Sequence, residues 1–297
     1  MENMIKAYLF AIIASFFMSI TFVLTKVIMQ EINVLSTSVY SFIFSFLFSI
    51  IFLKLVRKRK IIEPFRQHWK HMSIYGILGG VGGIIWFYSI DILGPNLLSF
   101  LLRFGLIFTI ILSVVFLKER FNRFEALGMV IAIIGALIMT YTTENLIIVV
   151  TLFVILMCAM FSISQLIVKT HIKKIDPFVI NQIRITFSLV TFLSLAIATS
   201  SLQAPSINVI ILSVITGITT GLIGFGLFFK ALEIAELSKL SLVKVLDPFL
   251  VIFFSFLILG DILTQQQFFG GLFVIFGIVI LIIARHRPKM RIEKDFT

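Results

Sequence analysis

A lysine and an aspartate stand three residues apart in an otherwise apolar stretch, KLSLVKVLDPFLVIFFSFLIL, residues 239–259. Positions three apart share one face of a helix, so Lys244 and Asp247 can neutralise each other there. Alternatively they form a substrate or proton site beside Pro248, which removes a helix hydrogen bond and would free a carbonyl group near Lys244. The spacing leaves both readings open.

Two further charges, Arg103 and Arg184, lie inside apolar segments. A charge at the centre of a bilayer costs about 2.5–3.5 kcal/mol, so it usually faces a partner or a water-filled cavity. The long side chains of Arg103, Arg184 and Lys244 could instead reach the lipid headgroups by snorkelling. Asp247 is too short to do so, and we therefore expect it to face a partner or a cavity.

Polar side chains also follow one another at helical spacing. Asn181, Arg184 and Ser188 share one helix face, and Ser38, Ser41 and Ser45 repeat that spacing earlier in the chain. Such stripes can hold helices together, but those with Arg, Asn or Gln favour a lined cavity, with aromatic residues as a wall. The candidate substrate-binding residues are Arg103, Arg184, Lys244, Asp247, Asn181, Gln165, Ser41 and Trp86.

Charges at the ends of the apolar segments suggest gates on the two sides of a membrane, although exposed interface charges need no partner. The candidate pairs are Lys26 with Asp91 or Asp261 on the outer side, and Lys169 with Glu233 or Glu119 on the inner side.

The elements that must position these residues are membrane spans. Hydrophobic residues make up 60% of the 297 positions and charged residues 13%, against roughly 25% charge in a soluble domain. About 20 apolar residues cross a bilayer as a helix, and the pattern lacks the alternation of a β-barrel. We read the first segment as a retained helix, not a cleaved signal peptide. The ten expected spans are 5–25, 35–56, 73–91, 96–117, 124–141, 147–168, 178–199, 208–229, 239–259 and 268–284.

The net charge of +11 comes from loops that fall on one side of this topology. Lys and Arg mark the cytoplasmic side, so both termini are expected inside. The basic surplus is thus explained by topology, to which anionic lipid headgroups can contribute, and not by binding to nucleic acid. The single Cys158 excludes a disulfide within the chain. His68 and His71 lack further metal ligands at suitable spacing, so no metal or cofactor is expected.

The first half of the sequence resembles the second half. At a shift of 142 residues, Gly128 and Gly135 fall on Gly270 and Gly277. In the first two spans the shift is 143, which puts Lys26 on Lys169. Five spans is an odd number, so the second copy enters the membrane inverted, and inverted repeats are typical of secondary transporters. We expect repeats at 1–143 and 144–286, followed by a basic cytoplasmic tail at 287–297.

The segment FLKERF that closes the fourth span, and the following ALGMVIAIIGALIM, resemble the EamA family of the drug/metabolite transporter superfamily. The resemblance implies a carrier of small metabolites, often an exporter, with a cavity lined by both halves. A proline common in the fourth span of that family is replaced here by Leu106, while the second copy keeps Pro248. The fourth span is therefore expected to be straighter than the ninth.

These observations predict an all-α polytopic membrane protein that works as a secondary active transporter of a small organic solute across the plasma membrane. Three cations against one acid favour an amino acid or an organic anion, with protons as a candidate coupling ion through Asp247. Export of lipophilic cations, with Asp247 as counter-charge, is the alternative. An intramembrane enzyme is disfavoured because no span holds a histidine or two acids. A scaffold or receptor would not explain an inverted duplication, and the oligomeric state stays open.

Overall fold

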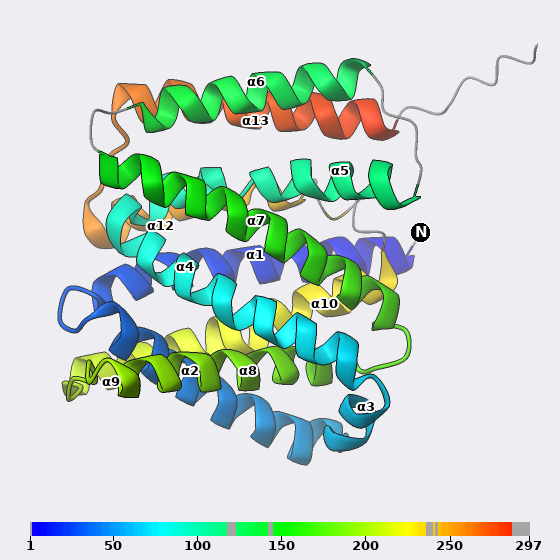
Figure 1. Ribbon diagram of the computed structural model, residues 1–297, viewed down its shortest axis with the longest axis vertical. Coiled ribbons are helices and arrows are strands. Elements are labelled where there is room, and N and C mark those ends of the chain that lie inside the picture. Colours follow the sequence, from blue (N-terminus) through cyan, green and yellow to red (C-terminus); the bar gives the residue numbers. More distant parts are fainter. Residues whose placement is uncertain (1, 118–122, 142–144, 236–239, 241–242, 287–297) are drawn as a thin grey trace, which may run out of the picture.

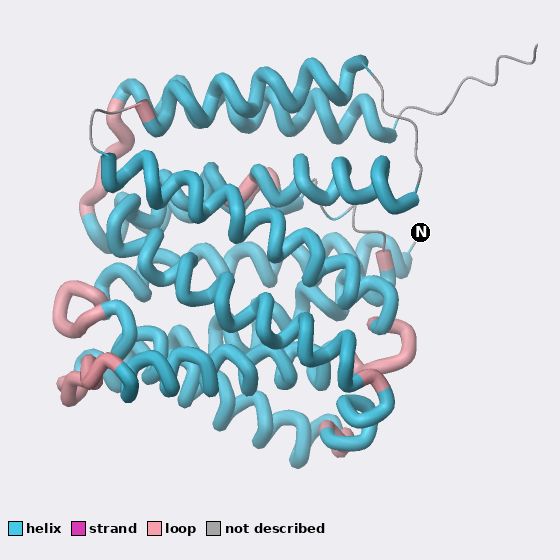
Figure 2. The backbone as a smooth tube through the Cα atoms, in the orientation of Figure 1, coloured by secondary structure: helices cyan, strands magenta, loops and turns pink. Residues whose placement is uncertain are grey.

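The computed structural model describes residues 2–117, 123–141, 145–235, 240 and 243–286. Every regular element within these residues is a helix, which confirms the expected all-α fold. Most of the connections lie at the two ends of the bundle (Figure 2). The helices are α1 (Glu2–Ile28), α2 (Val34–Ile51), η1 (Phe52–Arg57), α3 (Ile62–Gln67), α4 (Trp69–Leu101), α5 (Phe104–Leu117), α6 (Arg123–Thr140), α7 (Asn145–His171), α8 (Pro177–Ala198), α9 (Ile207–Thr216), η2 (Gly217–Gly224), α10 (Phe225–Ile234), α12 (Asp247–Leu259) and α13 (Gln265–His286).

Seven helical segments in the described part are long and apolar enough to cross a membrane, so the chain is a multi-pass membrane protein. Two shorter apolar helices, Asp247–Leu259 and Gln265–Leu281, accompany them. The seven segments are Asn3–Ile28, Val34–Arg57, Trp69–Leu101, Arg123–Thr140, Asn145–His171, Pro177–Ala198 and Ile207–Ile234.

The helix α4 contains a sharp change of direction at Gly94. This residue has a φ of 74°, which glycine adopts without steric cost, and Pro95 then suits the first turn of a new helical segment. The kink separates the expected third span from the start of the fourth. The helix α4 thus covers the expected third span and the start of the expected fourth span.

The fourth span is interrupted, so the expectation that it is straighter than the ninth is wrong. α4 ends at Leu101 and a turn at residues 102–103 precedes α5. In an α-helix the Ser99 carbonyl would accept the Arg103 backbone N–H. Here it accepts the Arg103 side chain at 3.2 Å from Nε, while the backbone N–H turns to the Phe100 carbonyl. At the break, a side-chain hydrogen bond thus takes the place of the backbone one, in a copy that lacks the proline.

A matching interruption lies at residues 245–246, just before α12 begins at Asp247. Pro248 lies in the first turn of α12, where its missing N–H costs no hydrogen bond. The earlier turn at 102–103, shifted by 142, falls on 244–245, within one residue of the later one. Both copies therefore carry a break at the corresponding place.

The helices α6 and α13 lie side by side along the upper edge of the molecule in Figure 1. A Cβ atom on Gly128 would come within 2.6 Å of the Gly277 carbonyl, and one on Gly135 within 2.7 Å of the Gly270 carbonyl. The first glycine of each copy thus meets the second glycine of the other, so the two helices are antiparallel. Glycine is required here because the backbones touch.

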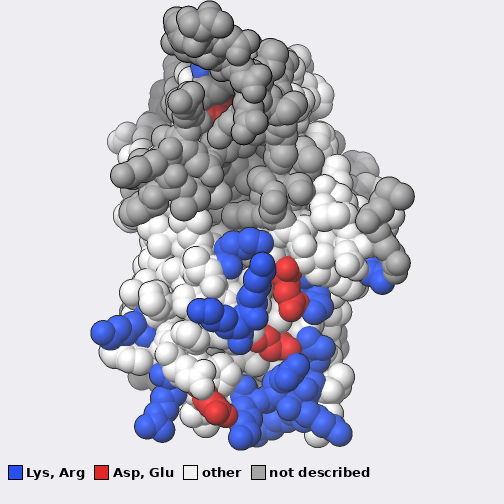
Figure 3. All heavy atoms as spheres, turned by 90° about the vertical axis from the view of Figure 1, so that its right-hand side faces the viewer, with Lys and Arg blue, Asp and Glu red and all other residues white. Residues whose placement is uncertain are grey.

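Lysine and arginine side chains gather on the face at the right-hand end of Figure 1, which Figure 3 turns toward the viewer. Exposed basic residues from η1 to the start of α4 belong to this end, among them Lys58, Arg59, Lys60, Arg66 and Lys70. The basic residues of this loop, which were expected on one side of the membrane, therefore gather at one end of the structure.

Candidate functional site

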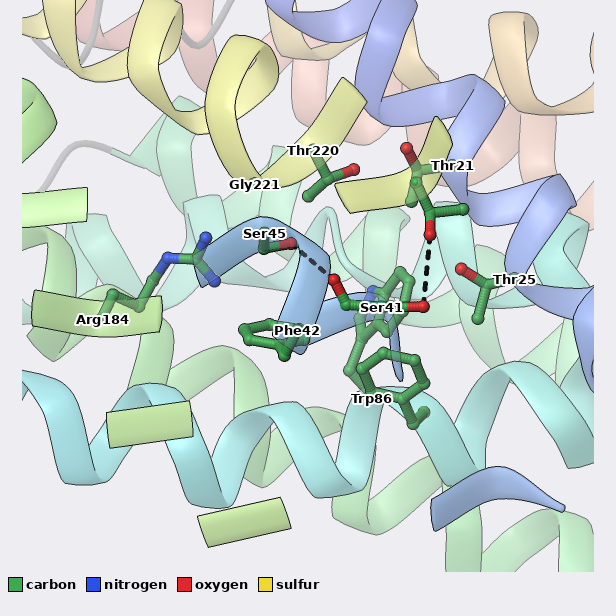
Figure 4. A pocket seen from close by; sticks show the side chains of 11 residues that line it. Thr21, Thr25, Ser41, Phe42, Ser45, Trp86, Arg184, Thr220 and Gly221 are labelled. Carbon is green, nitrogen blue, oxygen red and sulfur yellow. Dashed lines mark hydrogen bonds between the residues drawn. The ribbon is translucent and has the colours of Figure 1, made fainter. Parts of the chain in front are cut away.

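A small cavity of about 30 Å³ lies among helices of both halves of the chain (Figure 4). At roughly 10–15 Å³ for each water, it has room for about two water molecules. It is lined from α1, α2, α4, α8, α9 and η2 by Thr21, Thr25, Ser41, Phe42, Ser45, Trp86, Phe87, Arg184, Thr216, Thr220 and Gly221. We call it the central cavity.

Arg184 brings a positive charge to the central cavity. Its Nη2 donates to Asn181 Oδ1 at 3.0 Å, one turn back on α8, and its guanidinium lies 3.8 Å from the centre of the Phe225 ring. A cation over an aromatic face is attracted by the ring's quadrupole. Within the described residues no acidic side chain forms an ion pair with Arg184. The cavity therefore contains a charge that is held in place but not neutralised by a carboxylate.

Hydroxyl groups form much of the remaining wall. Thr216 Oγ1 donates to Ser41 Oγ at 3.2 Å, and Ser45 Oγ donates to the Ser41 carbonyl at 2.8 Å. The Thr220 hydroxyl is buried and has no hydrogen-bond partner in the part of the chain that the structure describes. Figure 4 shows Arg184 on one side of the cavity and Thr21 and Thr25 on the other. The wall of the cavity thus presents a positive charge on one side and hydroxyl groups on the other.

The π-helical stretch η2 shapes this wall. Its wider turns bring Gly221 against Ser45, where an added Cβ would lie 2.3 Å from the serine Oγ. The Gly221 carbonyl accepts a hydrogen bond from Asn181 Nδ2 at 2.5 Å. Asn181 therefore links the irregular helix to Arg184. π-helical segments are rare and often occur at functional sites.

Three of the predicted charges form a second group, the charge cluster of Arg103, Lys244 and Asp247. Asp247 Oδ2 lies 3.2 Å from Arg103 Nη2 and 3.5 Å from Lys244 Nζ. Arg103 is only 6% exposed, so it does not snorkel to the headgroups. Its Nη1 donates to the Lys244 carbonyl, which is the free carbonyl expected near this position. Two cations share one carboxylate, which leaves the cluster with one positive charge in excess.

The structure thus divides the candidate residues into two groups. Ser41, Trp86 and Arg184 line the central cavity, and Asn181 supports Arg184. The charge cluster is not among the residues that line the central cavity. The two groups are joined through α10, because Arg184 contacts the Phe225 ring and Lys244 Nζ lies 4.6 Å from the Phe228 ring centre, one turn further along the same helix.

Gln165 is half-buried on α7. No hydrogen bond joins it to another candidate residue in the part of the chain that the structure describes.

The two candidate gate lysines contact their expected neighbours in different ways. Lys26 Nζ lies 3.0 Å from Asp91 Oδ1 and donates to the Asp91 carbonyl at 2.7 Å. Lys169 Nζ donates to the carbonyls of Leu232 and Ala235, on either side of Glu233. Lys26 closes α1 and Lys169 closes α7, at opposite ends of the bundle (Figure 1).

The acids around these lysines have their own contacts. Glu233 pairs with Lys230 at 2.6 Å, and Asp261 accepts a hydrogen bond from Ser255 at 3.2 Å. Asp91 is thus the acid that Lys26 contacts. Glu119 and the tail 287–297 lie outside the described residues.

Several cavity residues were missed by sequence reasoning. Thr21 and Thr25 are four apart on α1, and Thr216 and Thr220 are four apart across α9 and η2. This spacing is a detectable signal, since residues four apart share a helix face.

An all-helical, multi-pass chain with a polar cavity between two halves has the architecture of a membrane transporter. Residues 5–141 and 148–283 each match the EamA-like transporter family, and the chain belongs to that family. A solved structure titled "Crystal structure of protein" is similar in fold, with a TM-score of 0.66 and 14% identity over 94% of this chain and 97% of that one. No curated protein matches the chain.

Proposed function

We propose that this protein is a secondary active transporter that exports a small organic solute bearing a carboxylate or phosphate, such as an amino acid or an organic anion. The observation that carries the proposal is the Arg184 guanidinium, which borders the central cavity without an acidic partner in the described part of the chain. An anionic group on the solute would offset the cost of that charge inside the membrane.

The charge balance of the spans supports an anionic solute. The charge cluster has two cations for one carboxylate, and Arg184 adds a further positive charge. Both groups border α10, so the positive potential extends over a region and not over one side chain. Such a potential favours anions and disfavours cations.

Alternating access is the proposed mechanism. Ligand pockets commonly measure about 300–1,000 Å³, so the central cavity at about 30 Å³ is closed around little more than water. The helices around it must move apart to admit a solute. Glycines at their contacts, such as Gly79 and Gly80 of α4 against α8, allow close packing without bulky side chains that would block sliding.

The proposed topology has ten spans, with repeats at 1–143 and 144–286. The protein lies in the plasma membrane, and both of its termini are in the cytoplasm. The basic end of the bundle supports this orientation because positive loops stay inside. The antiparallel glycine contacts between α6 and α13 support an inverted second repeat.

The function is tested first by binding. Purified protein is screened by thermal shift against amino acids, organic acids, nucleotides and cationic drugs. We expect an anionic or zwitterionic compound to raise the melting temperature of the wild type but not that of Arg184→Gln. Arg66→Gln, which removes an exposed arginine on α3, serves as the matched control and should bind like the wild type.

Transport is then measured in proteoliposomes with the compound that binds. Arg184→Gln and Lys244→Met should each reduce flux at least tenfold while the protein still inserts. Normal flux in both variants would remove these residues from the transport site and contradict the proposal.

Export of lipophilic cations is the alternative function, favoured by the aromatic rings of Phe42, Trp86 and Phe87 around the cavity. Its expected counter-charge, Asp247, already pairs with two cations and is not among the residues lining the cavity. Export that is lost in Asp247→Asn and retained in Arg184→Gln would select this alternative.

A further inference from the structure

Two interrupted helices meet at the charge cluster. The turn at residues 102–103 separates α4 from α5, and the turn at 245–246 precedes α12, which packs on α4. The last carbonyl groups before a helix end have no partner within the helix and carry the negative end of its dipole. Each interruption therefore presents oxygen atoms inside the membrane that need a donor or a cation.

Arg103 meets this need with three nitrogen atoms. Nε donates to the Ser99 carbonyl at 3.2 Å, Nη1 donates to the Lys244 carbonyl, and Nη2 donates to Asp247 Oδ2 at 3.2 Å. The guanidinium thus joins carbonyls from both interruptions to the carboxylate at the start of α12. Asp247 Oδ1 is buried and has no hydrogen-bond partner among the described residues, so within them the site retains one further acceptor.

This set of oxygen atoms is of the kind that binds an alkali cation. In transporters with interrupted helices, unwound carbonyls and the carboxyl ends of half-helices coordinate sodium ions near the bilayer midplane. Hard monovalent and divalent cations prefer carbonyl and carboxylate oxygens. Here the same kinds of oxygen atom surround the guanidinium of Arg103, a residue of the protein itself that is 6% exposed.

We propose that the crossing of the two interrupted helices is a cation site whose occupant is tethered. The Arg103 guanidinium fills the place of an exchangeable alkali cation, so no such ion binds at this crossing in the wild type. Arg103 is a positioning residue: it fixes the two interruptions relative to each other. The inference goes beyond the proposed function, because it concerns the crossing and not the transported solute.

The two repeats contribute unequally to this site. With the shift of 142, Arg103 corresponds to Val245 and Asp247 corresponds to Gly105. The first repeat therefore supplies the cation, and the second supplies the carboxylate and one of the carbonyls. A single arginine serves both interruptions, which explains why its contacts reach across about half of the sequence.

The test uses purified full-length protein in detergent and needs no transport substrate. The melting temperatures of the wild type, Arg103→Ala and Arg103→Ala/Asp247→Asn are compared in sodium, guanidinium and choline chloride at low millimolar concentration and constant ionic strength. We expect Arg103→Ala to melt several degrees below the wild type. Sodium and guanidinium should then recover at least half of that loss, relative to choline.

The controls separate a cation site from a merely structural arginine. The wild type should show no difference between sodium and choline, and the double variant should gain nothing from either cation. Rescue by guanidinium without a response to sodium would show that Arg103 only fills space, and it would overturn the inference. So would equal rescue of the double variant.

If Arg103→Ala does not fold, Arg103→Gln replaces it, since an amide can still donate to one carbonyl. The sodium response expected is the same, and its absence again overturns the inference. Because melting temperature is the readout, a protein that failed every transport assay would still give the predicted result. Failure of the proposed function and failure of this inference are therefore distinguishable.

Discussion

Arg103 and Arg184 are both arginines within apolar helices, yet their surroundings differ. Arg103 donates to two carbonyls and a carboxylate, so its charge is compensated within the protein. Arg184 lies over the Phe225 ring and bonds Asn181, a neutral amide. Burying an uncompensated charge is costly. In the proposed function, Arg103 therefore serves the fold, and Arg184 is the charge that would bind the solute.

Three histidines from distant parts of the chain meet at the basic end of the bundle. The rings of His68 and His71 each have their centres 5.0 Å from that of His171 at the end of α7. The pKa of His68 is lowered, first by desolvation and then by the nearby positive charges of His171, Lys174 and His71. Protonation of His68 is therefore less favourable in the folded protein than in the unfolded chain.

We predict that this arrangement makes the protein less stable in acid. Because the folded pKa lies below the ordinary value of 6.5, His68 binds a proton more readily in the unfolded chain. Its contribution to stability is full above pH 6.5 and is lost as the pH falls through the folded value. Between pH 8 and pH 5, the melting temperature of the wild type should fall further than that of His68→Gln. Parallel curves would contradict the prediction.

At the scale of helices, the contact between α6 and α13 depends on the absence of side chains. A Cβ atom on Gly135 would lie 2.5 Å from the Val274 backbone nitrogen, and backbone atoms cannot turn away as a side chain can. We predict that Gly135→Ala separates the two helices and costs roughly 1–3 kcal/mol by overpacking. Thermal unfolding in detergent measures the loss.

A matched control for that change is Gly105→Ala, also in a helix. A Cβ atom there has its nearest neighbour, Ser162 Oγ, at 3.9 Å. Its melting temperature should stay close to that of the wild type, or rise, since alanine favours helix. If both variants lost the same stability, the close approach of α6 and α13 would not be the cause.

The helices α2 and α8 begin with N-cap residues that correspond in the two repeats, and each cap residue also contacts another segment of the chain. Asn33 caps α2 and donates to the Ser201 carbonyl at 2.6 Å, beyond the end of α8. Asp176, which is Asn33 shifted by 143, caps α8 and pairs with Arg57 at 3.1 Å, at the end of η1. The first of these contacts joins neutral groups, and the second is an ion pair. Screening by salt should therefore weaken only the ion pair, which lies at the basic end.

Apolar runs predicted most of the helices, because crossing lipid leaves the backbone few alternatives. The break at residues 102–103 could not be predicted, since the Arg103 side chain there bonds the Ser99 carbonyl and also reaches residues 141 and 144 positions away. Arg184 was predicted as a site residue from its charge. The threonines of the cavity were not, since hydroxyls at helical spacing read equally well as contacts between helices.

At the scale of the whole molecule, the two repeats place corresponding lysines at opposite ends of the bundle. Lys26 fastens the end of α1 to Asp91 of α4, and Lys169 fastens the end of α7 to carbonyls at the end of α10. A closed central cavity between them is what an intermediate of alternating access requires. Each lysine contact lies at one end of the bundle, where the proposed alternating access needs a gate.

We predict that Lys26→Ala and Lys169→Ala open the protein toward opposite sides of the membrane. The measurement is the labelling of Thr25→Cys, a residue of the cavity wall, in a background with the buried Cys158 replaced by serine. In vesicles of known orientation, each lysine variant should increase labelling severalfold from its own side only. Lys60→Ala, which breaks an exposed pair with Glu63 that contributes little, should leave labelling unchanged. Increased labelling from the same side in both lysine variants would show that the two contacts are not opposing gates.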